Sequence, residues 1–220
     1  FKVLLNYNFM DQQQEQLDSI KAIRSMMERS SRFLSLSGLS GVLVGILAIV
    51  GVIVAYAFLG LSLNQPGYYH KLVNADGSLN FQVYSFLLTE LVLLLIIALA
   101  TAIYLSMRKA TARAIPIWDA TAKRLVMNMA VPLLTGAMFC IILLDHGYIS
   151  LIIPSTILFY GLAMYNASNY TLHDIRSLGL INIGLGLVAV YFIDYALLFW
   201  GLGFGVLHIV YGLYIYFKYD

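Results

Sequence analysis

The chain has 220 residues, of which 61% are hydrophobic and 11% charged, and its mean hydropathy is +0.84. An ordinary soluble domain carries about 25% charged residues, so the composition predicts a membrane protein. A net charge of +2 is too small to indicate nucleic-acid binding, and a single cysteine, Cys140, excludes a disulfide scaffold, a structural zinc finger and an iron–sulfur protein held by its own thiolates.

Residues 1–35 form the first predicted unit. Between residues 11 and 34, apolar residues such as Leu17, Ile20 and Met27 recur at helical spacing, with glutamines and charges between them. This pattern predicts an amphipathic helix that lies on the cytoplasmic membrane surface or on a protein partner. Met10 is a candidate natural start, because the residues before it do not resemble a signal peptide.

Six apolar runs follow, each close to the roughly 20 residues that carry a helix across a bilayer. They are residues 39–61, 83–107, 126–144, 149–165, 178–193 and 196–217. We therefore predict an all-α, polytopic membrane protein in which residues 36–220 form one domain of six transmembrane helices, surrounded by the lipid bilayer.

The basic residues predict the orientation of these helices. With six spans, twelve of the 13 lysines and arginines fall in the N-terminal segment, the second and fourth loops and the tail, whereas Lys71 alone falls on the other side. Basic residues accumulate on the cytoplasmic side, so both termini are predicted to be cytoplasmic.

Two loops are longer than a tight turn. The outer one, residues 62–82, contains turn sequences at 65–67 and 74–77. In the inner one, residues 108–125, we expect Pro116 near the start of a short surface helix and Trp118 at the level of the lipid headgroups. This loop is interpreted as an elbow, not as a substrate site.

Glycines at helical spacing mark faces where helices pack closely. Gly41 and Gly45 lie on the first span, and Gly201, Gly205 and Gly212 lie on the sixth. Such faces serve bundle assembly and homo-oligomer formation equally well. His208 shares the glycine face of the sixth span, so it is predicted to point into the bundle.

The sequence YGLxxY occurs at residues 160–165 and again at 211–216, at the same end of two helices that point the same way. Each copy follows an outer turn with an aspartate, Asp145 or Asp194. This pattern predicts helical hairpins repeated in parallel about an axis along the membrane normal.

Two ionisable residues lie inside the predicted spans. At 1.5 Å per residue, Glu90 is about 12 Å deep in the second span and His208 about 18 Å deep in the sixth. Such residues are functional candidates, because a charge in hydrocarbon is costly. The alternative is structural: a protonated or snorkelling Glu90 and a neutral, hydrogen-bonded His208. Asn182, expected near an end of the fifth span, is a third intramembrane polar candidate.

The sequence contains no catalytic constellation. It has no Ser/His/Asp order, no HExxH and no nucleotide-binding glycine pattern, so we predict that the protein is not an enzyme. His70, His146 and His173 fall in loops, which leaves His208 without a second imidazole at its depth for a haem site. We predict no metal site and no cofactor.

Five segments carry a resemblance to a known family: residues 28–41, 128–136, 139–147, 159–179 and 204–220. They resemble a family of small six-span bacterial inner-membrane proteins for which no activity is established. The resemblance covers nearly the whole chain after Met10 and implies a stand-alone multi-span protein of the bacterial cytoplasmic membrane. Members often carry an acidic residue where this chain has Asn182, a departure that argues against a proton relay in the fifth span.

Together these features favour a non-enzymatic scaffold, sensor or regulatory subunit that acts through helix packing and partner contact. The alternative is a small transporter or channel with a pathway past Glu90 and His208, and the third hypothesis is a haem- or lipid-binding subunit. A scaffold predicts a tightly packed bundle, a transporter predicts a polar cavity at Glu90 or His208, and a haem protein predicts a coloured sample.

Overall fold

The computed structural model describes residues 37–62, 67–112 and 118–219, and within these ranges the chain is all-helical, with no β-strand. The predicted amphipathic helix, Met10 and Pro116 lie outside the described residues, as does most of the 65–67 turn. Seven α-helices follow one another: α2 (Gly38–Leu59), α3 (Phe81–Ala112), α4 (Ala120–Asp145), α5 (Ile152–Ala167), α6 (Ile175–Tyr191), α7 (Ala196–Trp200) and α8 (Leu207–Tyr219).

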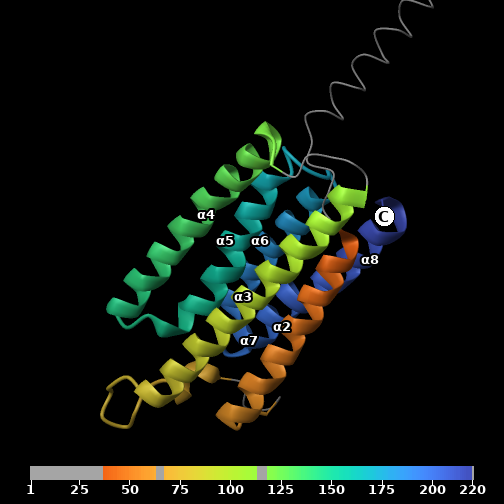
Figure 1. Cartoon of the computed structure of the whole chain (residues 1–220). Helices are drawn as coiled ribbons and strands as arrows, with labels where there is room; N and C mark the ends of the chain where they lie inside the picture. The colour runs from red at the N-terminus through yellow and green to blue at the C-terminus, as the bar shows by residue number, and fades with distance from the viewer. Residues whose placement is uncertain (1–36, 63–66, 113–117, 220) are drawn as a thin grey trace, which may run out of the picture.

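The long helices run side by side along one direction (Figure 1). The connection between α2 and α3, drawn in yellow, lies at the end of the bundle opposite the C-terminus. It holds a 3₁₀ turn, Tyr68–Lys71, and a tight turn in which the Gly77 amide donates to the Asn74 carbonyl at 3.0 Å. The turn predicted at 74–77 is confirmed, and its last residue is a glycine because φ there is +84°.

Five segments are long and apolar enough to cross a membrane. They are Gly38–Leu59, Phe81–Ala112, Ala120–Asp145, Ile149–Ala167 and Ile193–Tyr219. The remaining helix, α6, is apolar but has 17 residues. The prediction of an all-α membrane protein is confirmed in this form, with five to six helices of the required kind.

The contacts between helices fall into two sets, and α7 touches both. α4 packs on α5 and α5 on α6, whereas α8 and the residues before it pack on α2, and α3 packs chiefly on α2. Large apolar side chains along α3, among them Ile96 and Ile103, are more than half exposed. α3 therefore presents most of its surface to whatever surrounds the bundle.

The predicted packing glycines join the first and last helices. A Cβ atom on Gly41 would lie 3.1 Å from Cα of Gly212, and one on Gly45 would lie 2.6 Å from the carbonyl oxygen of Gly205. Gly201 faces Val52 of α2 in the same interface. Because only a hydrogen fits between these backbones, α2 and α8 approach closely along their antiparallel contact.

The last apolar run differs from the single helix predicted for residues 196–217. α7 gives way to a π-helical segment, Gly201–Val206, before α8 begins. Three glycines fall in this segment, and their lack of side chains permits the wider turn.

The inner loop is also shorter than the predicted range 108–125. α3 continues to Ala112, and α4 begins at Ala120, where the Asp119 carboxylate accepts a hydrogen bond of 2.7 Å from the Ala122 amide. Because Asp119 caps the helix, α4 begins before the apolar run at residues 126–144. Trp118, just outside the helix, is 63% exposed.

Candidate functional site

His208 lies in the first turn of α8 and is 8% exposed. Its Nδ1 atom is 2.9 Å from the carbonyl oxygen of Gly203, and its Nε2 atom is 2.6 Å from the hydroxyl oxygen of Tyr160 on α5. A carbonyl can only accept, so Nδ1 donates its proton to Gly203 and Nε2 accepts from the Tyr160 hydroxyl. This arrangement satisfies both nitrogens of a neutral imidazole inside the bundle.

Asn182 is the other polar side chain at this level, and it is fully buried. A Cβ atom on Gly203 would lie 2.7 Å from the Asn182 Oδ1 atom, so the glycine makes room for the amide. The Asn182 Nδ2 group donates to the Leu178 carbonyl at 3.0 Å, whereas Oδ1 has no hydrogen-bond partner among the described residues. Asn182 lies in the middle of α6 and not near its end as predicted, because the helix begins at Ile175.

Aromatic rings surround the His208 pair. Phe204 lies 4.6 Å from Tyr160 and 4.7 Å from Trp200, measured between ring centroids. The Phe204 ring is also parallel to the His208 ring, with the centroids 6.0 Å apart. The imidazole is therefore held in a packed, apolar setting that fixes its orientation.

Glu90 lies elsewhere, in a pocket bounded by α2, α3, α7, the start of α5 and the turn after α2. We call this the Glu90 pocket; its volume is about 170 Å³. Its lining is almost wholly apolar. Tyr68 and Leu72 contribute from the turn after α2, and the Tyr68 hydroxyl holds this turn in place by donating to the backbone carbonyls of Ile149 and Ser150 at 3.2 and 3.1 Å.

The level of Glu90 in the bundle follows from its neighbours on α3. Phe86, one turn earlier, stacks on Phe58 of α2 at 3.6 Å between centroids, and Leu94, one turn later, meets Gly51. Glu90 is therefore about one turn, or roughly 6 Å, below the end of α2 at Leu59. Because α3 begins at Phe81 and projects beyond the end of α2, Glu90 lies farther from the end of α3 than from the end of α2.

The structure thus assigns the two ionisable candidates to different surroundings. Both nitrogens of His208 are taken by Tyr160 and Gly203, whereas Glu90 lines the apolar pocket. The structure shows no hydrogen bond between Glu90 and His208, the two residues of the hypothetical transport pathway.

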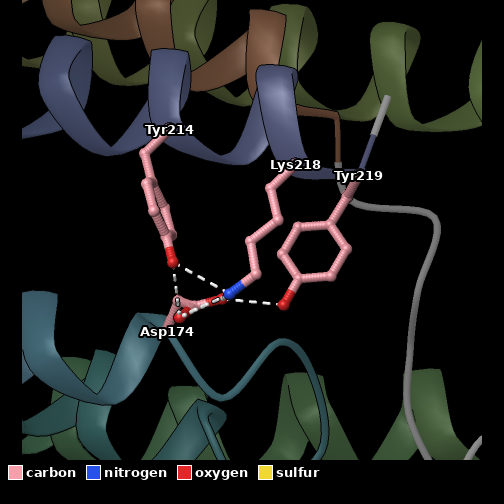
Figure 2. Close-up of polar contacts among 4 residues, drawn as sticks. All are labelled: Asp174, Tyr214, Lys218 and Tyr219. Atoms are coloured by element: carbon pink, nitrogen blue, oxygen red, sulfur yellow. Dashed lines mark hydrogen bonds and ion pairs between the residues drawn. The ribbon is translucent and has the colours of Figure 1, made fainter.

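A polar cluster that the sequence reasoning missed joins α6 to the end of α8 (Figure 2). Lys218 lies 3.1 Å from Asp174, and the hydroxyls of Tyr214 and Tyr219 donate to the same carboxylate at 3.4 and 2.8 Å. We call these four residues the Asp174 cluster. Partial burial raises the pKa of the Asp174 carboxyl, but the hydrogen bonds from Tyr219 and Lys218 outweigh burial and hold the pKa below its ordinary value.

A second aspartate accepts a tyrosine hydroxyl at the opposite end of the bundle. The Tyr69 hydroxyl donates to Asp194 at 2.8 Å, and this bond is the main reason that the pKa of Tyr69 is raised. His70 lies 4.0 Å from the same carboxylate oxygen. Asp194 thereby attaches the turn after α2 to the start of the last apolar segment.

Within the described ranges, no three His, Cys, Asp or Glu side chains gather closely enough to hold a metal ion. Comparison of the chain with protein-family models, curated proteins and solved structures finds no match. The resemblance to small bacterial inner-membrane proteins accordingly stays a prediction.

Proposed function

We propose that the chain is a six-span integral protein of the bacterial cytoplasmic membrane with both termini in the cytoplasm. α6 supplies the sixth span: its 17 residues extend about 25 Å, and it lies antiparallel to α5 along the contacts of Gly161 with Gly179 and of Gly186 with Leu158. A thin or locally pinched bilayer accommodates a helix of this length.

The charges of the described residues support this orientation. Lys71 is at the end of the bundle where α2 and α3 are joined, whereas the other lysines and arginines are near the opposite end. Those residues are Arg108, Lys109, Lys123, Arg124, Arg176 and Lys218. Under the positive-inside rule, that basic end faces the cytoplasm.

We infer further that the protein is a non-enzymatic scaffold, sensor or regulatory subunit. The observation that carries this proposal is that His208 and the glycine faces are used for contacts inside the bundle. His208 is bonded on both sides, and Gly41, Gly45, Gly205 and Gly212 close the α2–α8 contact. The outward faces of α3 and α4 are then left for lipid and for protein contact, as is the amphipathic helix that the sequence predicts for residues 11–34.

The alternative is a transporter or channel past Glu90 and His208. A pathway for ions needs polar surface, and the pocket at Glu90 is lined almost wholly by apolar side chains. The haem hypothesis requires a free imidazole nitrogen, and both nitrogens of His208 already have partners. These two observations favour the scaffold class.

The scaffold proposal is tested by the mass of the assembly extracted in mild detergent. We expect a complex larger than the 24.5 kDa chain. It should be lost in Ile20→Glu, on the predicted apolar face of the N-terminal segment, and retained in Gln14→Glu, on the predicted polar face. Masses at multiples of 24.5 kDa indicate a homo-oligomer instead of a partner protein. A monomer from native membranes contradicts the proposal.

The transporter alternative has its own measurement. Reconstituted vesicles containing the protein are expected to show no proton or ion flux above that of empty vesicles. A flux that is present in the unmodified protein and absent in Glu90→Gln establishes the transporter and overturns the scaffold.

A further inference from the structure

We propose that the Glu90 pocket binds a lipophilic amine, with the apolar body of the ligand in the pocket and its protonated nitrogen against the Glu90 carboxylate. This inference goes beyond the scaffold role and holds whether or not the protein has a protein partner.

The size of the pocket sets the size of the ligand group that enters it. A volume of about 170 Å³ is similar to the roughly 150 Å³ of an engineered apolar cavity in another protein, which stays dry and binds benzene. The Glu90 pocket therefore holds one aromatic ring or a short stretch of alkyl chain. A larger amphiphile has to leave the rest of its body outside, between α3 and the bilayer.

The lining of the pocket requires the ligand to be apolar over most of its surface. Leucine and isoleucine side chains dominate the lining, and Trp200 adds an aromatic face. Two of the polar side chains are already satisfied: Thr156 donates to the Ile153 carbonyl at 2.7 Å, and Tyr68 donates to the carbonyls of Ile149 and Ser150. A purely polar ligand finds few partners there.

Glu90 supplies the specificity for a cation. It is the single charged side chain among the lining residues, and it makes no hydrogen bond or ion pair with any residue that the structure describes. A carboxylate and a protonated amine form a charge-assisted hydrogen bond, and this bond is stronger in a low-dielectric setting than in water. The amine thus provides the partner that the chain itself does not.

The position of Glu90 allows such a ligand to approach from the nearer membrane surface. The carboxyl group is about one turn below the end of α2, and the pocket continues inward to Leu94 and Gly51. An amphiphile can thus keep its nitrogen near the interface while its chain points toward the apolar end of the pocket. α3 packs chiefly on α2, which leaves its other flank to face the entering molecule.

The experiment uses Trp200 as a reporter inside the pocket. The chain has two tryptophans, and Trp118 lies near the start of α4, at the opposite end of the bundle from the pocket's turn. In a full-length Trp118→Phe protein, fluorescence then reports Trp200 alone. The probes are bromohexylamine and bromohexanol, which carry the same heavy-atom quencher on the same chain.

We expect bromohexylamine to quench Trp200 saturably and to be displaced by unbrominated hexylamine. Bromohexanol should bind about tenfold more weakly, which corresponds to about 1.4 kcal/mol. Glu90→Gln should reduce amine binding to the level of the alcohol. Asp145→Asn is the matched control, since it removes an exposed carboxylate outside the pocket, and it should bind the amine as the parent does.

Three results overturn the proposal: equal binding of the amine and the alcohol, unchanged amine binding in Glu90→Gln, or quenching without saturation and competition. Equal binding would leave the pocket as a site for apolar chains of any kind. The comparison of the two probes is made on protein with Glu90 intact, so it stands even if Glu90→Gln fails to fold. Elution volume and far-UV circular dichroism establish whether that variant is folded.

Discussion

Each ring nitrogen of His208 has one partner, and this pairing determines the effect of a change at Tyr160. In Tyr160→Phe the ring remains but Nε2 of His208 becomes a buried acceptor without a donor. We expect a loss of about 1–3 kcal/mol in the free energy of unfolding. Denaturation of the purified protein in detergent measures it. Tyr191→Phe, at a residue that is 82% exposed, is the control, and equal stability of the two variants would contradict the expected role of the bond.

The stability that the Asp174 carboxylate contributes to the folded protein is expected to depend on pH. Its native pKa lies below the value of about 3.9 in an unfolded chain. The carboxylate therefore contributes stability above that pH, and the contribution is lost as the pH falls through the native pKa. Asp174→Asn should lower the melting temperature at neutral pH by about 1–3 °C, since the ion pair is partly exposed and solvent screens it. Below the native pKa of Asp174 the melting temperatures of the variant and the parent should converge.

The control for this experiment is Asp145→Asn, which removes a carboxylate that is 83% exposed. Its melting temperature should follow that of the parent at every pH. A constant difference between Asp174→Asn and the parent down to pH 2 would show that the titration of this carboxyl does not matter for stability.

At the same scale, the sequence indicates which residues are unusual but not which residues they meet. Glu90 and His208 stand out because they are ionisable residues in apolar runs. What surrounds them depends on how helices far apart in the chain are arranged, as in the Tyr160–His208 bond across 48 positions. The Asp174 cluster had one local indication, since Tyr214 and Lys218 are four residues apart and so lie on one face of α8.

At the scale of helices, glycine contacts predict unequal effects of the same substitution. A Cβ atom on Gly212 would lie 2.5 Å from the backbone nitrogen of Val42, whereas one on Gly184 would have no atom within 4 Å. Gly212→Ala should destabilise the protein by about 1–3 kcal/mol or prevent its folding, because backbone must move. Gly184→Ala should be neutral or slightly stabilising. Thermal unfolding in detergent compares them, and a neutral Gly212→Ala would mean that α2 and α8 pack less closely than the structure shows.

Helix ends were harder to predict than helix faces. Spacing of small residues indicates a close-packing face directly, and Gly41, Gly45, Gly205 and Gly212 do lie between α2 and α8. The span predicted at residues 126–144 is shorter than α4, because the helix includes polar residues before the apolar run. α4 begins at Ala120, where Asp119 caps it. The π-helical turn before His208 has no periodicity of its own that distinguishes it from an α-helix.

At the scale of the whole molecule, the contact between α2 and α8 joins the first described helix to the last. The Tyr160–His208 bond and the Asp174 cluster connect α5 and α6 to the same α8. Side chains of α8 are therefore bonded to α5 and to the start of α6 while its backbone packs on α2, whereas α3 packs chiefly on α2 and α4 on α5. The two YGLxxY copies fit this plan, because Gly161 and Gly212 each lie at an antiparallel helix contact, and the parallel repeat stays a prediction.

The number of membrane spans, and with it the side on which the C-terminus lies, depends on whether α6 crosses the bilayer. If α6 crosses the bilayer, residues 169 and 191 lie on opposite sides, and both termini lie in the cytoplasm; if it does not, Lys218 moves to the outer face with Lys71 while the other basic residues keep their side. The test uses single cysteines at exposed positions, Ser78→Cys, Asn169→Cys and Tyr191→Cys, in a Cys140→Ser background. A membrane-impermeant maleimide added to intact cells should label positions 78 and 191, and position 169 only after permeabilisation. Labelling of 169 and 191 from the same side would reduce the count to five spans and place the C-terminus outside the cell.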